Sequence, residues 1–411
     1  MVVALRHNAG RTDSAHTMPV SNPFANVRIA VVHDWIDTWR GGENVLAEVL
    51  AIVPHAELYA LVDFLPEHLR PRLLGKRAHT TFLQRLPGAR RYFRALLPLF
   101  PRAIAGLDLS AFDVIVSISH AVAKGVRTRP DQLHVCYCLT PMRYAWGLRE
   151  TYLTSAGAST GWRRPIADRI LDRLRAWDAS RSSDVTCFLA ISLYVAERIR
   201  RCYARDAQVV YPPVDTDFFT TLAAVRTERS YVTASHWVPY KRLDLIVEAF
   251  RATPERRLMV LGGGPDTGKA RLGAPPNVRF LGSVSREVLR DALRAARAFI
   301  FAADEDFGIA PLEAQACGTP VIAFARGGTL ETIRGLDASA PTGVFFRDQS
   351  AASIRDAVDA FEASAERVTE QSCRANALRF APDVFRESFV RCLAAAIDEF
   401  RSGHRGEAER C

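Results

Sequence analysis

The chain has 411 residues, 48% of them hydrophobic and 24% charged, a balance that supports a folded core and excludes wholesale disorder. This length predicts two or three domains, and the longest apolar runs, about seven residues, fall far short of the roughly 20 that a transmembrane helix needs, so no membrane span is expected. The excess of 54 Lys and Arg over 45 Asp and Glu, a net charge of +9, indicates an anionic partner, with nucleic acid, a membrane surface and a phosphorylated small molecule all left open.

Short apolar, β-rich runs alternate with amphipathic stretches along the chain. Strands are expected at residues 28–32, 114–118, 135–139, 186–191 and 208–211, and again at 231–234, 258–261, 278–281, 298–301, 321–324 and 344–346. Helices are expected at 43–53, 243–250, 286–296, 354–360 and 385–400. This alternation is typical of parallel sheets covered on both faces and predicts an α/β protein with two Rossmann-like, doubly wound domains facing each other across a cleft.

The break between the two series of strands falls at Pro212 and Pro213, which lock an extended segment. We therefore expect a first domain at residues 27–212, a second at 213–384, and a C-terminal helix and tail at 385–411, the helix crossing back to the first domain. Residues 1–26 are polar and mixed, without the apolar stretch of a signal peptide, and are expected to be a flexible tail. The eight cysteines form no Cys-x-x-Cys pair, which is typical of free thiols in a reduced cytosolic protein.

Two segments that join a predicted strand to a helix carry features of an anion site. Gly41 and Gly42 would let backbone amides approach an anion at a helix N-terminus, although a tight turn explains them equally. Lys241 and Arg242 lie where the helix dipole disfavours cations, and an anion at the same place would explain them; a solvated surface pair is the alternative.

A third segment, residues 304–323, places three acids directly after the strand at 298–301. Glu305 and Glu313 are separated by a loop and about one helical turn, so both could enter one pocket. The amides of Phe307, Gly308 and Ile309 and the helix that follows would form an anion cradle. Solvated loop acids are the alternative.

Together these segments resemble family 4 retaining glycosyltransferases of the GT-B fold, over about residues 27–400. The motifs, in chain order, are HDW at 33–35, SHAVAKG at 119–125, TPMRYAW at 140–146, VPYKRLDL at 238–245 and EDFGIAPLEAQACGTPVIA at 305–323. They are most similar to the bacterial branch that contains O-antigen and exopolysaccharide mannosyltransferases.

The resemblance implies a role for each matching residue. The catalytic residues would be Glu305 on the donor sugar, Lys241 on the diphosphate and His120 on the transferred sugar. The donor-binding residues would be Gly41, Gly42, His236, Lys241, Phe307, Gly308, Ile309, Leu312 and Glu313, with Glu313 on the ribose hydroxyls, and Arg143 and Tyr144 would lie near the acceptor. The first domain would then be the acceptor-side domain and the second the nucleotide-sugar-binding domain.

Three positions depart from the family pattern. His236 stands where the family usually has Arg, Leu139 where it has His, and Ile191 precedes Ser192 where an Asn-Ser pair is common. Because histidine is not obligatorily cationic, diphosphate binding is expected to be weaker, and Leu139 weakens any claim for a second catalytic histidine in the first domain. An impaired or retuned enzyme is compatible with these departures.

Neither a metal nor a cofactor is expected beside the nucleotide sugar. Asp304-x-Asp306 and Asp215-x-Asp217 fit the Asp-x-Asp pattern of another glycosyltransferase fold, but so short a string arises easily by chance. Residues 66–105 carry nine basic residues against one acid, interleaved with aromatic and aliphatic ones, which is typical of a membrane surface. We expect Arg90, Arg91 and Arg94 to contact an anionic membrane; a solvated face is the alternative, and no nucleic-acid module is recognisable.

The expected function is transfer of a hexose, with mannose from GDP-mannose ahead of UDP-sugars, to a lipid-linked saccharide in cell-surface polysaccharide synthesis, with retention at the anomeric carbon. The protein would be cytoplasmic and peripheral on the inner face of the membrane. A nucleotide-sugar 2-epimerase and a non-catalytic nucleotide-sugar-binding protein are the alternatives. A dehydrogenase is disfavoured, because Gly262-Gly-Gly-Pro265 lacks the third glycine of a dinucleotide fingerprint.

Overall fold

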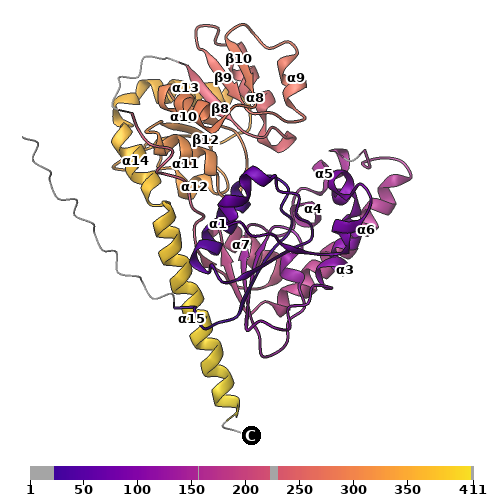
Figure 1. Ribbon diagram of the computed structural model, residues 1–411. Coiled ribbons are helices and arrows are strands. Elements are labelled where there is room, and N and C mark those ends of the chain that lie inside the picture. Colours follow the sequence, from indigo (N-terminus) through magenta and orange to yellow (C-terminus); the bar gives the residue numbers. More distant parts are fainter. Residues whose placement is uncertain (1–22, 156, 223–229, 409–411) are drawn as a thin grey trace, which may run out of the picture.

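The computed structural model describes residues 23–155, 157–222 and 230–408, and contains two parallel β-sheets (Figure 1). The first sheet has seven strands in the order β3-β2-β1-β4-β5-β6-β7, and the second has six in the order β10-β9-β8-β11-β12-β13. In both sheets the second and third strands of the series lie to one side of the first strand, and the fourth begins on its other side, as in doubly wound folds. The predicted α/β fold with two Rossmann-like domains is confirmed.

The first sheet holds β1 (Ile29–His33), β2 (Glu57–Ala60), β3 (His79–Thr80), β4 (Val114–Ser119), β5 (Leu133–Cys138), β6 (Cys187–Ala190) and β7 (Gln208–Val209). Its helices are α1 (Gly41–Ile52), α2 (Ala89–Tyr92), α3 (Phe100–Ile104), α4 (Arg143–Trp146), α5 (Arg149–Ser155), α6 (Arg163–Arg181) and α7 (Leu193–Tyr203), with 3-10 segments that include η2 (Phe82–Arg85) and η3 (Phe93–Leu99). The five strands expected here are present, and β2 and β3 are additional.

The second sheet holds β8 (Tyr231–Ala234), β9 (Leu258–Leu261), β10 (Val278–Gly282), β11 (Phe299–Phe301), β12 (Val321–Phe324) and β13 (Gly343–Phe346). Its helices are η6 (Pro239–Lys241), α8 (Leu243–Arg251), α9 (Thr267–Arg271), α10 (Arg286–Ala295), α11 (Ile309–Ala316), α12 (Thr329–Thr332), α13 (Ala351–Ala363) and α14 (Glu370–Leu378), followed by α15 (Pro382–Ala408). All six expected strands are present within two residues of their predicted bounds.

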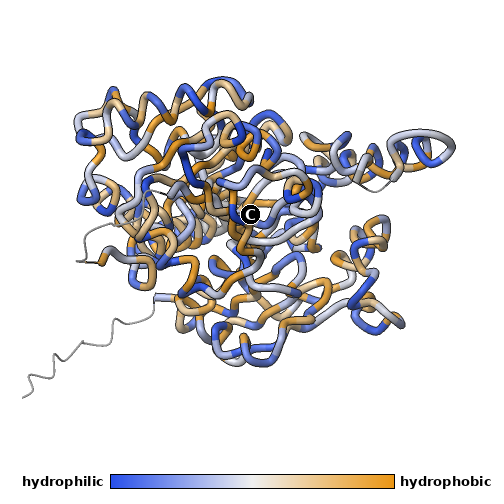
Figure 2. The backbone as a smooth tube through the Cα atoms, turned by 90° about the horizontal axis from the view of Figure 1, so that it is seen from above, coloured by the Kyte–Doolittle hydropathy of each residue, from blue (hydrophilic) through white to orange (hydrophobic). Residues whose placement is uncertain are grey.

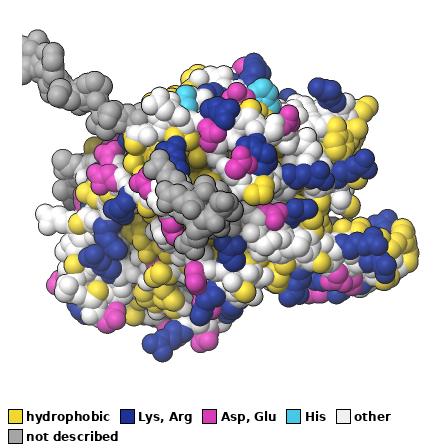
Figure 3. Space-filling model, turned by 90° about the horizontal axis from the view of Figure 1, so that it is seen from below, with side chains coloured by type: hydrophobic (Ala, Val, Ile, Leu, Met, Phe, Trp, Pro, Cys, Tyr) yellow, Lys and Arg dark blue, Asp and Glu magenta, His cyan; other side chains and the backbone are white. Residues whose placement is uncertain are grey.

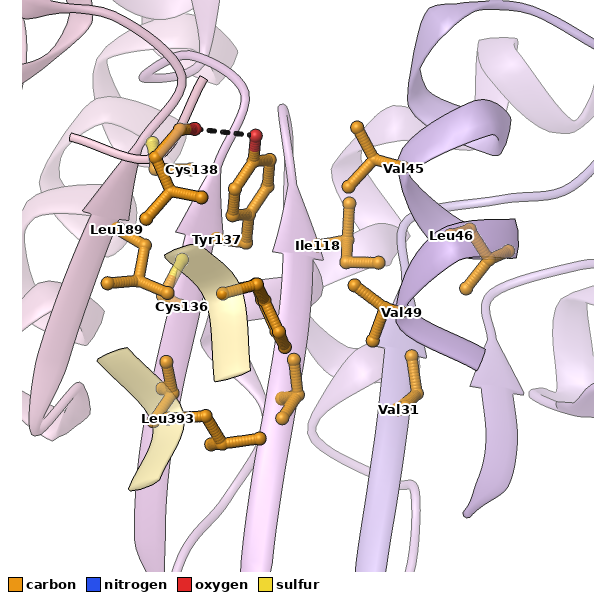
Figure 4. Packing of buried hydrophobic residues seen from close by; sticks show 14 of the residues in the cluster. Val31, Val45, Leu46, Val49, Ile118, Cys136, Tyr137, Cys138, Leu189 and Leu393 are labelled. Carbon is orange, nitrogen blue, oxygen red and sulfur yellow. Dashed lines mark hydrogen bonds between the residues drawn. The ribbon is translucent and has the colours of Figure 1, made fainter. Parts of the chain in front are cut away.

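Both faces of each sheet are buried, because the side chains of a strand alternate between two hydrophobic clusters. Ile29 and Val31 of β1 belong to one cluster, whereas Ala30 and Val32 belong to the cluster on the opposite face. Val45, Leu46 and Val49 of α1 cover the first of these faces, as Figure 4 shows. Along the outer helices, hydrophobic residues alternate with hydrophilic ones (Figure 2). The resulting layers leave the carboxyl ends of the strands free to carry a site.

The last helix, α15, packs against the first domain although it follows the second in sequence (Figure 1). Phe385, Phe389 and Leu393 are buried in the same cluster as Tyr137 of β5, whose ring lies 5.9 Å from that of Phe385. Tyr137 also donates a hydrogen bond to the Val210 carbonyl at 2.8 Å. This helix therefore ties the two domains together.

The predicted N-terminal tail needs one correction. Residues 1–22 lie outside the described part of the chain, but residues 23–26 form a turn, and Phe24 is only 1% exposed in the first domain's core. The packed structure therefore includes part of the segment that was expected to be flexible. The boundary at residues 212 and 213 stays a prediction. Among the described residues, no helix is both long enough and apolar enough to cross a bilayer.

Candidate active site

Two helix N-termini meet between the domains. Gly41 begins α1 after β1, and Ile309 begins α11 after β11. A Cβ atom added at Gly41 would lie 2.6 Å from Cδ1 of Ile309, so the two helices touch across the domain boundary, and a larger residue at position 41 would force the Ile309 side chain to move. Backbone amides at a helix N-terminus attract anions, and two such ends facing each other make a preformed anion site.

Cationic side chains surround this place. Lys241 lies at the end of η6, and its ammonium is hydrogen-bonded to the carboxylate of Glu305. Burial, the largest cause, and the guanidinium groups of Arg143 and Arg40 together lower the pKa of Lys241 to about 7, while the carboxylate of Asp306 opposes them. Burial also lowers the pKa of His236, with Arg40 and Lys241 contributing. The cations are thus crowded together, and a bound anion would relieve their repulsion.

Arg40 is the functional candidate that sequence reasoning missed. It is exposed, it comes from the first domain, and its charge acts on both Lys241 and His236 of the second. Its backbone N–H donates to Glu43 at 2.8 Å, which fixes the start of α1. The signal that could have found it is its position directly before Gly41 and Gly42, where a cation opposes the helix dipole.

Glu305 is held rigidly by two glycines from the next strand-to-helix loop. The amide of Gly328 donates to the Glu305 carbonyl at 2.8 Å. Gly327 adopts φ +77°, and a Cβ there would collide with the same carbonyl oxygen. The carboxylate of Glu305 is 16% exposed. A side chain with this fixed backbone and a lysine beside it can orient a polar ligand at little entropic cost.

Glu313 lies in the second turn of α11 and is the other acid of the pair. Burial raises its pKa to about 7, while Arg286 lowers it and Asp215 raises it. No described residue hydrogen-bonds to its carboxylate, which suits a partner that brings its own hydroxyl groups. Phe307 and Leu312, two of the expected donor-binding residues, have side chains buried in the hydrophobic core, so only their backbone is available to a ligand. Gly308, at φ +90°, is the N-cap of α11.

Asp304 and Asp306, the acids of the Asp-x-Asp string, are engaged by arginines. Asp306 accepts from Arg143 at 2.9 Å and from Arg198 at 2.6 Å, both from the first domain. Asp304 pairs with Arg326 at 3.0 Å. Within the described residues, no three His, Cys, Asp or Glu side chains group in a way that could hold a metal ion.

Arg143 therefore lies against the second domain, where it also donates to the Tyr240 hydroxyl at 3.2 Å. Its expected place near the acceptor stays a proposal, but the structure shows that it links the two domains. Ser192 adds a second link, because its hydroxyl donates to the Asp306 carbonyl at 2.6 Å. Contacts between domains such as these form or break when the domains close or open, so they can respond to domain closure.

Directly after the carboxyl end of β1, the buried carboxylate of Asp34 orients His120. Asp34 accepts hydrogen bonds of 2.6–2.9 Å from four successive amides, residues 120–123. Although burial alone would raise it, the pKa of Asp34 is held well below its usual range by His120 and His33 and by these backbone bonds. Nδ1 of His120 lies 2.9 Å from Asp34, which leaves Nε2 as the nitrogen that a ligand could meet.

Two buried polar atoms near His120 lack a partner among the described residues, namely Nε2 of His33 and the hydroxyl of Tyr144. A Cβ at Gly42 would lie 3.4 Å from that His33 nitrogen and 3.2 Å from Leu139. Burial raises the pKa of Tyr144, and the charge of Asp34 contributes. Buried polar atoms are nearly always hydrogen-bonded, so these two indicate a place for ligand hydroxyl groups.

The motifs at residues 119–125 and 140–146 are joined through one buried carboxylate, that of Asp178 in α6. Lys124 pairs with Asp178 of α6, and the indole N–H of Trp146 donates to the same carboxylate at 2.7 Å. The Tyr203 hydroxyl donates to it as well, also at 2.7 Å. This network positions α4, which carries Arg143 and Tyr144. Sequence reasoning did not single out Asp178, because nothing local to α6 marks it.

Comparison with known proteins points to a family for the second domain. The family model described as glycosyl transferases group 1 matches residues 216–378. Residues 216–378 form a group 1 glycosyltransferase domain. Lys241, Glu305 and Glu313 lie within this glycosyltransferase domain, whereas Arg40 and His120 belong to the first domain.

Curated relatives match about half of the chain. The D-inositol 3-phosphate glycosyltransferase of Mycolicibacterium smegmatis is 28% identical over 250 residues, 56% of this chain and 55% of that protein. The GDP-mannose-dependent alpha-(1-6)-phosphatidylinositol monomannoside mannosyltransferase of the same organism is 30% identical over 227 residues, 47% of this chain and 57% of that protein. The chain thus spans about half the length of these relatives.

Solved structures extend the likeness to both domains. The sucrose-phosphate synthase of Thermosynechococcus elongatus superimposes with a TM-score of 0.67 at 18% identity, over 90% of this chain and 100% of that one. Anabaena HepE in complex with UDP gives 0.65 at 14% identity, with the same coverage. These structures establish the GT-B fold for the glycosyltransferase domain and the domain that faces it.

The segment expected to contact a membrane is largely exposed. Arg90 and Arg91 have no carboxylate partner among the described residues, whereas Arg94 pairs with Asp37 at 2.5 Å. Phe82, Tyr92 and Leu99 are 45%, 53% and 40% exposed. Seen from below, basic and hydrophobic side chains are interleaved along one edge of the molecule (Figure 3).

Proposed function

We propose that this protein transfers a hexose from a nucleotide diphosphate sugar to a lipid-linked saccharide, with retention at the anomeric carbon. The observation that carries the proposal is the meeting of the α1 and α11 N-termini beside the Lys241–Glu305 pair. A donor of this class presents an anionic diphosphate next to a sugar with several hydroxyl groups. The site offers amides and cations for the former and a fixed carboxylate for the latter.

The chemical demand is to stabilise the leaving diphosphate and a sugar with oxocarbenium character. Lys241, Arg40 and the amides of the two helix N-termini would meet the developing negative charge with preorganised positive charge. Donor binding would divide the Lys241–Glu305 pair, because the diphosphate would take the ammonium and the sugar hydroxyls would take the carboxylate. His120, oriented by Asp34, would contact the sugar from the opposite domain.

This assignment requires neither a metal ion nor a cofactor. The positive charge that a divalent cation would supply to the diphosphate comes from Lys241 and Arg40. Asp304 and Asp306 are already paired with Arg326, Arg143 and Arg198, so binding a cation there would break three ion pairs. We therefore propose a metal-independent transferase.

GDP-mannose is the proposed donor, and UDP-sugars are the alternative. A relative at 30% identity is named as GDP-mannose-dependent, which supports mannose. The solved neighbours that hold UDP or UDP-glucose are about 15% identical or less and bear on the fold alone. The acceptor and a role in cell-surface polysaccharide synthesis follow from the resemblance of the motifs to O-antigen and exopolysaccharide enzymes.

We also place the protein on the cytoplasmic face of the membrane, as a peripheral protein. The exposed rings and aliphatic groups of residues 82–99 support this, since Phe82 and Tyr92 expose about half of their surface beside unpaired Arg90 and Arg91. A lipid-linked acceptor would then be reached without leaving the bilayer surface.

A donor panel tests the proposal. Purified protein is incubated with GDP-mannose, UDP-glucose and UDP-GlcNAc; donor binding is followed by thermal shift and products by proton NMR. We expect GDP-mannose to stabilise the protein by about 2.7 kcal/mol at 100 times its Kd, and GDP to be released slowly even to water. A C2 epimer formed without nucleotide release would identify a 2-epimerase. Binding with no turnover on lipid acceptors would identify a binding protein.

A further inference from the structure

Helices α5 and α6 form a hairpin that projects from the first domain at the right-hand edge of Figures 1 and 3. Its base adjoins the cleft, because the ring of Tyr152 in α5 lies 5.7 Å from that of Tyr144 in α4. Its inner face is anchored by Leu153, Leu171 and Leu174, which are buried in the domain's core. The outer part of the hairpin is not covered by any other described part of the chain.

Ion pairs between α5 and α6 involve the acidic residues of the hairpin. Arg149 of α5 pairs with Asp168 at 2.7 Å and with Asp172 at 2.6 Å, and Arg164 of α6 pairs with Glu150 at 2.7 Å. These bonds cross between the two helices and hold the hairpin as one unit. They also use every carboxylate of residues 149–175, so none is left to balance the remaining arginines.

Along the outward face of α6, apolar side chains at the start of the helix are followed by arginines. Trp162, Ile166, Arg169 and Arg173 recur every three or four residues, which places them on one side of the helix. Trp162 is 73% exposed and Ile166 53%, and both lie at the tip, whereas the arginines lie further along. Within the described residues, no carboxylate lies at ion-pair distance from Arg163, Arg169 or Arg173.

We infer that the tip of the α5–α6 hairpin docks on an anionic phospholipid bilayer. Trp162 and Ile166 enter the boundary between headgroups and acyl chains, and Arg163, Arg169 and Arg173 meet the lipid phosphates. A tryptophan combines an apolar ring with one N–H donor, the combination that membrane interfaces favour. Arg163 lies over the Trp162 ring at 5.5 Å, and Arg169 and Arg173 follow further along α6, so cations flank the apolar residues as they do at a membrane interface.

A protein partner fits these observations less well. The exposed apolar surface is confined to a narrow projecting tip, whereas stable protein interfaces bury about 800 Å² on each side around a hydrophobic centre. The uncompensated charge is all of one sign, which suits a laterally extended anionic surface. The inference does not depend on glycosyl transfer, but it would turn the hairpin, whose base carries Tyr144 near the proposed acceptor, toward the bilayer.

The experiment is co-sedimentation of the full chain with vesicles of phosphatidylcholine alone or with 30% phosphatidylglycerol. We expect binding to the anionic vesicles only. Trp162→Ala with Ile166→Ser should weaken it about tenfold or more, and Arg163→Gln, Arg169→Gln and Arg173→Gln together by roughly 100-fold at low salt. Unchanged binding in both variants would overturn the inference.

Matched controls lie in the second domain. Leu272→Ser removes an apolar side chain that is 83% exposed, and Arg271→Gln, Arg279→Gln and Arg347→Gln remove the same charge from another surface. Both should bind vesicles like the unaltered protein, and equal losses in these controls would contradict docking through the hairpin. GDP-mannose thermal shift in the hairpin variants separates this inference from the proposed function. A lost vesicle contact with a normal donor shift supports docking whatever the reaction proves to be.

Discussion

Donor binding should take up a proton at Lys241. Burial and the guanidinium groups of Arg143 and Arg40 lower the pKa of Lys241 to about 7 in the free protein. A diphosphate that replaces the Glu305 carboxylate beside this ammonium carries two negative charges where Glu305 carries one, so it favours the charged form more strongly, and binding should return the pKa toward the ordinary value of about 10.4. Because binding raises this pKa, the affinity is highest where the ammonium is already charged, below about pH 7, and falls as the pH rises above 7.

The size of the effect follows from the protonated fraction of Lys241. With a pKa of about 7, roughly one tenth of the free protein carries this proton at pH 8, so binding should take up about 0.9 proton there. The Kd should rise about tenfold between pH 8 and pH 9. Calorimetry at pH 8 in two buffers of different ionisation enthalpy measures the uptake. The diphosphate of a nucleotide sugar is esterified at both ends and does not titrate in this range.

Glu313 supplies the control, because its proton should move in the opposite direction. Burial raises its pKa to about 7, and ribose hydroxyls that donate to the carboxylate would lower it, so Glu313 should release a proton on binding near pH 7. Glu313→Gln should therefore increase the net uptake at pH 7, and Lys241→Gln should convert it to a release. A binding enthalpy in Glu313→Gln that does not depend on the buffer at pH 8 would refute the reasoning.

Three further predictions follow from the ion pairs and the surface. Asp306→Asn removes a carboxylate that is 5% exposed and pairs with Arg143 and Arg198, so it should lower the free energy of unfolding by about 3 kcal/mol, measured by urea denaturation, whereas the exposed Asp337→Asn should change it little. A loss below about 0.5 kcal/mol in Asp306→Asn would contradict the interdomain role. Transfer should persist in excess EDTA, because Lys241 and Arg40 supply the charge; activity that EDTA abolishes and Mn²⁺ or Mg²⁺ restores would instead implicate Asp304 and Asp306. Changing Arg90, Arg91 and Arg94 together to Gln should weaken binding to anionic vesicles by roughly 1 kcal/mol per residue at low salt, and binding that ignores both salt and these changes would indicate a solvated face.

The fold was largely predictable because the strands of both sheets are buried on both faces. β1 and β4 are buried at every position, so they read as continuous apolar runs that periodicity detects. β3 has only two residues, and β2 begins with the exposed Glu57, so neither carries such a run. α6 escaped notice because arginines occupy most of its surface and only Leu171, Leu174 and Asp178 are buried.

Only those parts of the candidate site that lie within one short segment of the sequence could be predicted. Gly41, Gly42, Lys241 and Glu305 each sit at a strand-to-helix junction, a position that the sequence reveals. The pairing of Arg143 with Asp306 joins residues 163 positions apart, and the buried Lys124–Asp178 pair joins residues 54 positions apart. Nothing in either local pattern names the partner, because such contacts exist only in the folded chain: the first joins the two domains, and the second joins two elements of the first domain.

The central claim is that a nucleotide sugar reacts at the Lys241–Glu305 pair between the domains. The most direct measurement is the rate at which Glu305→Gln consumes the donor that best stabilises the unaltered protein, with the product's anomeric configuration read by NMR. We predict that Glu305→Gln folds normally and loses about 10²–10³-fold in turnover, and that the unaltered protein retains the α configuration of GDP-mannose in its product. Near-normal turnover in a folded Glu305→Gln protein, or a product of inverted configuration, would contradict the account.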